Sequence, residues 1–484
     1  MISDIPLWLP SLDPIGVFII ALSPILLFFL TAPKRQHFPL LNGREWFELS
    51  YTHAKQRYLS DARNIIRSGL KEASVFRVIS DNGPKTILAP KYATDIRSHP
   101  SLSFGASISK EFHSNIRGFE PFQQGTRSDE LFQTAGVLRS PYPMRHPLHS
   151  RKNGQQILPS ILKIVAQLSS KVFLGDQICR NPDWLRITIS YTVDSFVAAR
   201  ALRQWPEFMR PLVANFLPCC HKIRRELEEA RSIINPVLEE RRQAKKEAVR
   251  TGKPLNRFND AMQWMEEVAK GRSYDAAVAQ ISFSLAAIHT TTDMLTQVLL
   301  DMCGKEEIIQ ALREEVVSVI QKEGWKKTTL YKLKLMDSVL KESQRLKPIG
   351  IGDIKLSDGT LLRKGTFLLV SGEKMWDPQV YSSPDTFDPY RFLKLRETPG
   401  HETSAQLVSP SPEHLGFGYG NHACPGRFFA VNEVKIALCH ILLKYDFKLA
   451  PGSARPTVKK TGVSWNADPT ASIAIRRRQE EITL

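Results

Sequence analysis

The pattern of apolar and polar positions predicts five long helices. Apolar residues recur three and four positions apart over 273–302, 333–346 and 427–443, which places them on one face of a helix. The same reading over 155–174 and 184–199 indicates two further helices. Most of the periodic sequence is therefore expected to be helical.

A β-hairpin is predicted in the N-terminal part of the chain. Two short runs that favour strands, at 75–79 and 86–89, flank the turn-forming sequence Ser-Asp-Asn-Gly. Residues 91–98 then follow as a short predicted helix. The sequence contains no internal repeat and no low-complexity tract.

The first 33 residues carry the signature of a membrane anchor. Residues 15–30 form an apolar run of 16 residues without a charge, which as a helix would extend about 24 Å, slightly less than a thin reticulum bilayer. Lys34 and Arg35 follow the run and no basic residue precedes it, so the rest of the chain is expected on the cytoplasmic side. A cleaved signal peptide is the alternative, but its basic n-region is missing. We predict an anchor over 1–33 and a folded domain over 34–484.

Charge and cysteine content narrow the expected partners. The formal net charge is +17, and a basic chain can bind nucleic acid or an anionic membrane. In 222–250 the basic residues alternate with Glu, which is typical of a solvated helix face, so no nucleic-acid partner is expected. The six cysteines show no paired or metal-binding spacing, which indicates a reducing compartment and no disulfide framework.

One cysteine, Cys424, stands between a glycine-rich loop and a predicted helix. Gly416, Gly418 and Gly420 lack side chains, so the loop backbone can approach a flat ligand closely. Pro425 suits the first turn of a helix, which places Cys424 at a helix N-terminus, where the dipole favours a thiolate. Such a thiolate can ligate haem iron. For a lone cysteine, a buried structural role would be the better interpretation.

The neighbours of Cys424 resemble the haem-binding signature of the cytochrome P450 family. Phe417, Gly420, Cys424 and Gly426 are in register with that signature. His422 stands where most members have an Arg that contacts a haem propionate. The resemblance implies that these five residues bind haem b, with Cys424 as the axial ligand of the iron.

The predicted helix over 273–302 contains the sequence Ala-Ala-Ile-His-Thr-Thr-Thr at 286–292. A buried core helix with hydroxyls bonded to the preceding turn is one interpretation. In the resembled family, Thr290 matches a hydroxyl that helps to deliver protons during oxygen activation. Ala287 replaces the usual Gly and His289 replaces the usual acid. Imidazole can carry protons near neutral pH, so His289 is expected to assist Thr290.

A third motif places Glu342 and Arg345 three positions apart on a predicted helix. Such pairs are common on surfaces, where they contribute little. The resemblance implies that Arg391, within the downstream sequence Phe-Asp-Pro-Tyr-Arg-Phe, joins them in a buried triad. The members of such a triad need one another, because an unpaired buried charge is costly.

Two segments depart from the family. In 135–153, Pro141, Pro143 and Pro147 rule out the regular helix whose Trp and Arg face the propionates in relatives. Between 347 and 359 the chain is too short for the usual strand, propionate-binding Arg and pocket residues. A divergent active site, an alternative splice form and a faulty gene model would each explain these departures.

The resemblance implies a mainly α-helical haem-thiolate fold with a small β region, anchored in the endoplasmic reticulum with its catalytic domain in the cytosol. Residues 101–122 would form the loop that covers the substrate. The expected reaction is insertion of one oxygen atom from O₂ into a hydrophobic small molecule, with electrons from NADPH through a flavoprotein reductase. Both central motifs resemble those of fungal members that oxidise terpenoids and other secondary metabolites. Two alternatives stay open: haem-thiolate desaturation, isomerisation or dehydration, and a membrane protein without catalytic activity, with or without haem.

Overall fold

The computed structural model describes residues 38–123, 155–254, 257–347 and 366–484. The predicted anchor and both atypical segments lie outside these ranges. Contacts between residues group Leu40–Leu484 into one compact unit. The domain boundary after residue 33 stays a prediction.

The predicted hairpin is confirmed and forms part of a three-stranded sheet. Strands β1 (Val75–Ser80) and β2 (Gly83–Leu88) pair antiparallel, and β4 (Phe367–Val370) pairs parallel to β2. Ser80 lies opposite Gly83, so the loop contains two residues rather than the four that the sequence indicated. Helix α2 (Thr52–Glu72) packs its Tyr58 and Ile66 on the buried side chains of this sheet.

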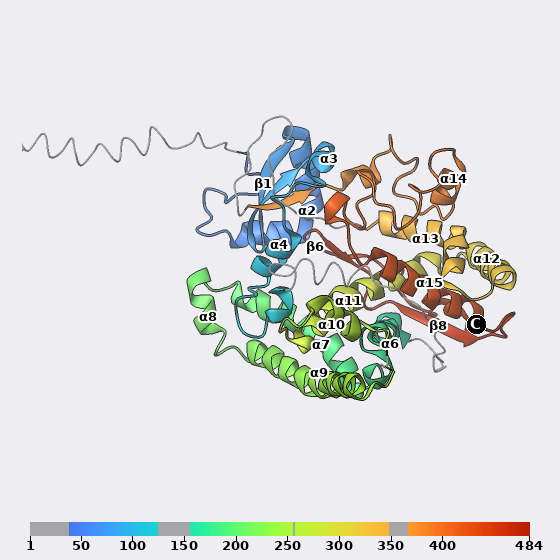
Figure 1. Cartoon of the computed structure of the whole chain (residues 1–484). Coiled ribbons are helices and arrows are strands. Elements are labelled where there is room, and N and C mark those ends of the chain that lie inside the picture. The colour runs from blue at the N-terminus through green and yellow to red at the C-terminus, as the bar shows by residue number, and fades with distance from the viewer. Residues whose placement is uncertain (1–37, 124–154, 255–256, 348–365) are drawn as a thin grey trace, which may run out of the picture. The chain divides into compact units, whose positions relative to one another are not determined.

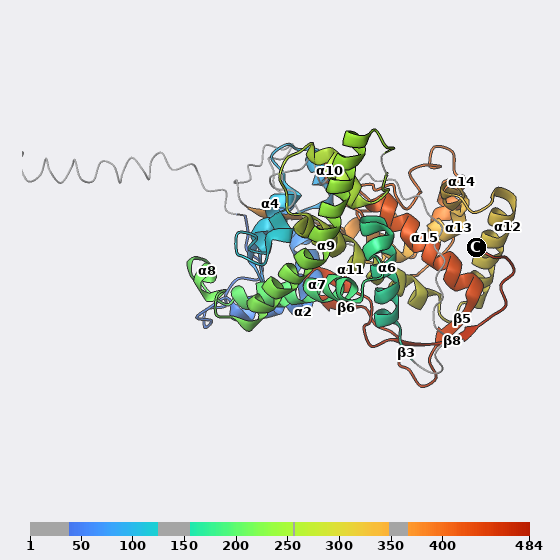
Figure 2. The ribbon, with the colours of Figure 1, turned by 60° about the horizontal axis from the view of Figure 1, so that its bottom comes forward.

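The long helix α11 (Ala276–Met302) occupies the centre of the unit. It contacts α6 (Ile157–Ile178), α7 (Pro182–Leu202) and α9 (Pro218–Thr251) on one side. On the other side it contacts α13 (Lys334–Arg345) and α15 (Arg427–Lys444), as Figure 1 and Figure 2 show. Eighteen of its residues are buried, which explains why nearly every position between its ends is apolar or small. All five predicted long helices are confirmed, with bounds shifted by a few residues.

Shorter elements complete the unit. The remaining α-helices are α3 (Ala93–Ile96), α4 (Phe104–Glu111), α8 (Arg210–Val213), α10 (Ala261–Ala269), α12 (Glu306–Glu323) and α14 (Arg391–Glu397). A second sheet has the order β3 (Gln155–Gln156), β8 (Ser472–Arg477), β5 (Tyr445–Leu449), and β6 (Lys459–Thr461) pairs with β7 (Ser464–Asn466). The mainly helical fold with small β regions is thus as expected. Residues 101–122 contain α4 and a loop in which Phe112 stacks on Phe122, with ring centroids 4.1 Å apart.

Within the described ranges, α6 alone is long and apolar enough to cross a membrane. Half of its most apolar window is buried inside the protein. It packs on α11 and also contacts α15, and its buried Ser169 donates a hydrogen bond to Glu433 of α15 over 2.7 Å. We therefore assign α6 to the core of the folded unit.

Candidate functional site

Backbone hydrogen bonds hold Cys424 in place. Its N–H donates to the carbonyl of Phe417 over 2.7 Å, and this bond closes the loop that precedes α15. The N–H of Asn421 donates to the carbonyl of Arg97 over 2.7 Å, which fastens the loop to the chain beyond α3. The Cys424 side chain is exposed. The Arg427 guanidinium also donates to the Cys424 carbonyl over 2.9 Å. The thiol is therefore accessible on a backbone that is bonded on both sides of the peptide unit.

Protein atoms explain why this loop requires its glycines. Gly418 and Gly420 have φ angles of 73° and 61°, in the left-handed region that L residues rarely adopt. A Cβ at Gly420 would lie 2.1 Å from the carbonyl oxygen of Arg97, and one at Gly418 would lie 2.5 Å from that of His422. At Gly426 the nearest atom would be the Cys424 sulfur, 4.0 Å away, which is an ordinary contact. The first two glycines are thus fixed by the fold itself.

The protonation of the Cys424 thiol reflects two opposing effects. Desolvation by the surrounding atoms raises its pKa above the ordinary value, even though solvent reaches the side chain. The N–H groups of Gly426 and Arg427 and the Arg427 charge act in the opposite direction. The helix-end effect predicted from the sequence is present, but desolvation outweighs it. A bound cation would therefore have to displace the thiol proton, as metal ions do at cysteine ligands.

His422 contributes a polar atom without a partner. Its Nε2 is buried and has no hydrogen-bond partner among the described residues. Burial lowers the pKa of this imidazole, so the ring is neutral at pH 7. A buried polar atom that lacks a partner costs free energy. A carboxylate from a ligand would satisfy it, which fits the predicted contact between His422 and a haem propionate.

The centre of α11 presents two residues to solvent. Ala286 and Thr290 are exposed one turn apart, although Ile288, Thr291 and Thr292 around them are buried. The Thr290 hydroxyl donates to the carbonyls of Ala286 over 2.8 Å and Ala287 over 3.2 Å. The hydroxyl is thus bonded to the preceding turn, as a core helix would have it, and yet it remains open to solvent. Thr290, the accessible Cys424 thiol and the unpartnered His422 are thus each open to a ligand, and their binding of one haem stays a prediction.

His289 lies on a different side of α11 from Thr290. Consecutive helix positions differ by about 100°, and the His289 ring nitrogen Nε2 lies 3.2 Å from the carbonyl of Ile189 in α7. Desolvation lowers the pKa of His289, with the Ile189 carbonyl acting against it. The structure therefore does not bring the two side chains to a common partner, and the role of His289 in proton delivery stays a prediction.

The structure brings Glu342, Arg345 and Arg391 together. Arg345 donates to both carboxylate oxygens of Glu342 over 2.8 and 2.9 Å, and both side chains are fully buried. Arg391 Nε donates to the same two oxygens at 3.1 Å each. The guanidinium groups also donate to the backbone carbonyls of Pro384 and Ser382, each over 2.7 Å. This network fixes α13 against the segment that leads into α14.

Sequence reasoning missed Lys341, a second charged group of α13. Its ammonium is buried and donates to the carbonyls of Ser404, Gln406 and Ser409 over 2.7 to 3.0 Å. Burial lowers the pKa of Lys341 to about 8. Its position on the buried face of an amphipathic helix is the sequence signal that could have identified Lys341. The hydrogen bonds of Lys341 hold residues 404–409, which lead toward the cysteine loop.

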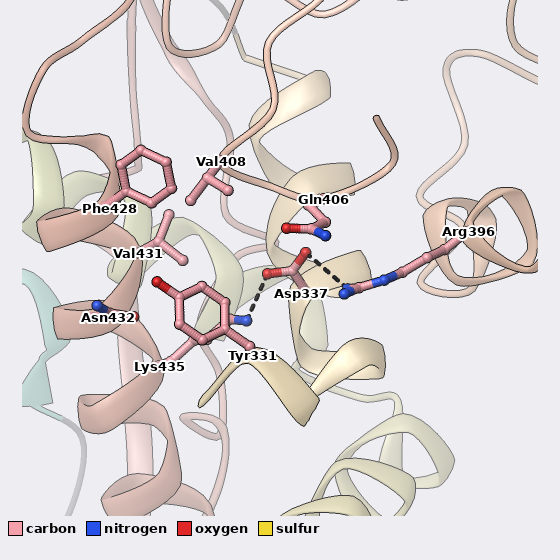
Figure 3. A pocket seen from close by; sticks show the side chains of 9 residues that line it. All are labelled: Tyr331, Asp337, Arg396, Gln406, Val408, Phe428, Val431, Asn432 and Lys435. Atoms are coloured by element: carbon pink, nitrogen blue, oxygen red, sulfur yellow. Dashed lines mark ion pairs between the residues drawn. The ribbon is translucent and has the colours of Figure 1, made fainter. Parts of the chain in front are cut away.

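Sequence reasoning also missed Asp337, which joins α13 to α15 (Figure 3). Its carboxylate pairs with Lys435 of α15 at 2.6 Å and with Arg396 of α14 at 3.6 Å. It also accepts the N–H of Leu407 over 2.8 Å. The adjoining cavity, which Phe428 of α15 helps to line, has a volume of about 10 Å³, enough for roughly one water molecule. Ion pairs of Asp337 thus connect α13 to α14 and α15 (Figure 3), and the cavity beside them is too small for a substrate.

Comparisons with known proteins agree with this geometry. A model of the family "Cytochrome P450" matches residues 146–473. The chain is 51% identical to "Cytochrome P450 monooxygenase adrA" of Penicillium rubens, over 100% of this chain and 99% of that protein. It is 47% identical to "Cytochrome P450 monooxygenase trt6" of Aspergillus terreus, over 90% and 94% of the two chains.

A solved structure supports the fold. The cyanobacterial CYP120A1 with bound retinoic acid superposes with a TM-score of 0.63, covering 91% of this chain and 99% of that one. At 16% identity this likeness bears on the fold alone. The family model and the high identity to full-length relatives carry the assignment: the chain belongs to the cytochrome P450 family of oxidoreductases.

Proposed function

We propose that this chain is a haem-thiolate monooxygenase that inserts one oxygen atom from O₂ into a hydrophobic small molecule, a terpenoid or another fungal secondary metabolite. Family membership implies a haem cofactor. The observation that carries the proposal is the accessible Cys424 thiol, held by the Phe417 carbonyl at the start of α15. The family resemblance in both central motifs favours the substrate class.

Each predicted site residue would have its own role toward the cofactor. Bound haem supplies the oxygen-activating chemistry, with electron density from the thiolate favouring O–O cleavage. Cys424 would hold the iron, His422 would bond a propionate, and Phe417, Gly420 and Gly426 would shape the loop around them. Thr290 would hold a hydroxyl for proton delivery. Because its hydrogen is bonded to the Ala286 and Ala287 carbonyls, its exposed oxygen could accept a hydrogen bond from a water. His289 would assist from the neighbouring position on α11.

The exposed face of α11 supports a hydrophobic substrate. Ala286 offers a methyl group and Thr290 a hydroxyl that is already bonded to the backbone. Neither residue carries a charge that would select an ionic substrate. Glu342 pairs with both Arg345 and Arg391, so these charged groups serve the scaffold.

We further propose attachment to the endoplasmic reticulum membrane through residues 1–33, with electrons arriving from NADPH through a reductase. Exposed apolar side chains support membrane contact. Phe208 and Phe216, before and after α8, are 83% and 75% exposed, and Trp46 and Leu49, close to the predicted anchor, are 96% and 97% exposed. Apolar surface of this kind is typical of membrane or partner contact.

A reduced carbon monoxide difference spectrum tests the haem-thiolate proposal. The full-length chain in detergent should give the red-shifted Soret band after which the family is named. A band at the shorter wavelength of thiol or histidine ligation would contradict the proposal.

Labelled oxygen tests the reaction type. In microsomes that contain a reductase and NADPH, a terpenoid that is converted should gain one ¹⁸O atom per molecule from ¹⁸O₂. A product without label would instead favour desaturation, isomerisation or dehydration.

A further inference from the structure

Asp293 lies three positions beyond Thr290 on α11, about 60° from it around the helix axis. Asp293 Oδ1 accepts the backbone N–H of Ala467 over 2.7 Å. Its Oδ2 forms an ion pair with the ammonium of Lys347, just beyond the end of α13. Residues from three distant parts of the chain therefore meet next to the exposed position of Thr290.

Hydrogen bonds within the segment 457–470 stabilise its conformation. Asp468 accepts the N–H groups of Thr457 and Thr470 over 3.0 Å each, and the Thr470 hydroxyl over 2.7 Å. These hydrogen bonds lower the pKa of Asp468 to about 2, so the carboxylate stays charged at neutral pH. The segment 457–470 is thus braced internally, and the bond to Asp293 joins it to the central helix.

The end of α13 depends on the same carboxylate. The Lys347 side chain is 9% exposed and Asp293 is the ion-pair partner of its ammonium. Removing one member of a nearly buried pair leaves an unpaired charge, which is strongly destabilising. Asp293 therefore restrains the chain where it leaves the scaffold helix.

We propose that Asp293 is a positioning residue for the substrate space beside Thr290. It holds the 457–470 segment and the end of α13 against α11 within one turn of Thr290, the residue that the proposed function places beside the substrate. Asp293 acts through Ala467 and Lys347 and does not itself touch the substrate or the cofactor. The inference rests on the proposed function, because it assigns that space to the substrate.

Four variants separate the parts of this arrangement. Asp293→Ala removes both bonds. Asp293→Asn keeps an oxygen for the Ala467 N–H but loses the charge, and Lys347→Met removes the ion pair alone. Asp275→Asn is the control, because Asp275 lies at the other end of α11 and pairs with Arg231 of α9 at 2.8 Å instead.

Two azole probes of different size provide the readout, namely imidazole and N-tritylimidazole, each titrated into the haem-loaded full-length protein by its spectral shift. Imidazole is small and needs only access to the haem. The bulky N-tritylimidazole also needs the 457–470 segment and the end of α13 to be in place. Asp293→Ala should bind N-tritylimidazole about tenfold more weakly, since hydrogen bonds to charged groups contribute a tenfold effect or more. The affinity of Asp293→Ala for imidazole should stay within about twofold of the wild-type value, a smaller change than the loss of one such hydrogen bond would cause. Asp293→Asn and Lys347→Met should show part of the loss, and Asp275→Asn none.

Limited proteolysis gives a readout that needs no haem. Trypsin should cleave Asp293→Ala faster than the wild type after Lys459 or Lys460 and should cleave Asp275→Asn at the wild-type rate. Unchanged or tighter N-tritylimidazole binding by Asp293→Ala, or equal losses for both azoles, would overturn the inference. If the wild type shows no haem-thiolate band, the proposed function fails, and unchanged proteolysis would separately overturn the role of Asp293.

Discussion

The cysteine loop and the exposed face of α11 are built in opposite ways. Around Cys424, backbone groups make the connections. The Cys424 N–H binds the nearby Phe417 carbonyl and the Asn421 N–H binds a distant carbonyl, that of Arg97, while two left-handed glycines allow the close approach. Around Thr290, by contrast, side chains make the connections, and their partners come from distant segments. The first site is therefore fixed mainly by main-chain hydrogen bonds, and the second by charged side chains.

Helix α13 serves both regions. Its Gln344 packs so closely on Gly416 that a Cβ there would lie 2.3 Å from the glutamine side chain. Its buried Glu342 and Arg345 lock the helix to the later chain, and Lys347 beyond its end reaches Asp293. The charged triad thus supports the cysteine loop and the α11 face at once.

The largest effect should follow from removing the thiol. We expect Cys424→Ala and Cys424→His to abolish monooxygenase turnover, because neither side chain supplies thiolate electron density. Cys219→Ala is the control, since Cys219 lies on α9 and should leave turnover unchanged. Product formation by microsomes that contain each variant provides the measurement. Normal turnover by either Cys424 variant would exclude Cys424 as the iron ligand.

Two glycines test whether the backbone fixes the loop. In Gly420→Ala the new Cβ would collide with the Arg97 carbonyl at 2.1 Å and would sit at a φ of 61°. In Gly426→Ala it would meet only the Cys424 sulfur at 4.0 Å, an ordinary contact. We expect Gly420→Ala to lose most haem-thiolate signal and Gly426→Ala to keep most of it, as judged by carbon monoxide difference spectra at equal protein concentration. Similar spectra for both variants would show that the loop adapts and that the backbone account is incomplete.

Sequence alone was sufficient where local rules decide the structure. The helix around Thr290 and the N-terminal hairpin each depend on neighbours in the chain, and both elements are confirmed, although the hairpin loop is shorter than predicted. The loop glycines were expected to admit a flat ligand. The structure shows an additional reason for two of them. At Gly420 and Gly418 the position of a Cβ would overlap the carbonyl oxygens of Arg97 and His422, respectively.

Sequence was insufficient where the partner lies far along the chain. Nothing near His289 indicates that its ring meets the Ile189 carbonyl, a hundred positions away. The carbonyls that satisfy Lys341 are more than sixty positions distant, and a buried lysine is rare without such partners. Asp293 looks like an ordinary polar position on a helix until Ala467 folds onto it.

Proton delivery provides the next smaller effect. Thr290→Val keeps the shape of the side chain but deletes the exposed hydroxyl, so we expect product formation to fall by about 10² to 10⁴ while NADPH consumption continues and hydrogen peroxide accumulates. Thr291→Val is the matched control, because the Thr291 hydroxyl is buried without a partner and its loss should cost little. His289→Ala should give a milder form of the Thr290→Val defect. Full coupling in Thr290→Val with normal haem content would make Thr290 a packing residue.

The smallest effect concerns Glu433 of α15, which accepts a hydrogen bond from Ser169 of α6. Burial raises the pKa of Glu433 to about 8, with the Ser169 hydrogen bond acting against it. Between the ordinary carboxyl pKa near 4.5 and this value, the folded chain keeps a proton that the unfolded chain has lost. The free energy of unfolding therefore falls as pH rises through this window and levels off above about pH 8.

Glu433→Gln should remove this dependence, because an amide does not titrate. Relative to the wild type, its Tm should be similar near pH 5 and should be higher by a few degrees near pH 8, on the order expected for one buried ionisation in a large domain. Ser169→Ala is the control: it deletes the hydrogen bond but keeps the carboxyl, so its Tm should still fall with pH. Parallel curves of Tm against pH for the wild type and Glu433→Gln would mean that Glu433 is ionised in the folded protein. The connection between α6 and α15 would then need a cation that the described residues near Glu433 do not supply.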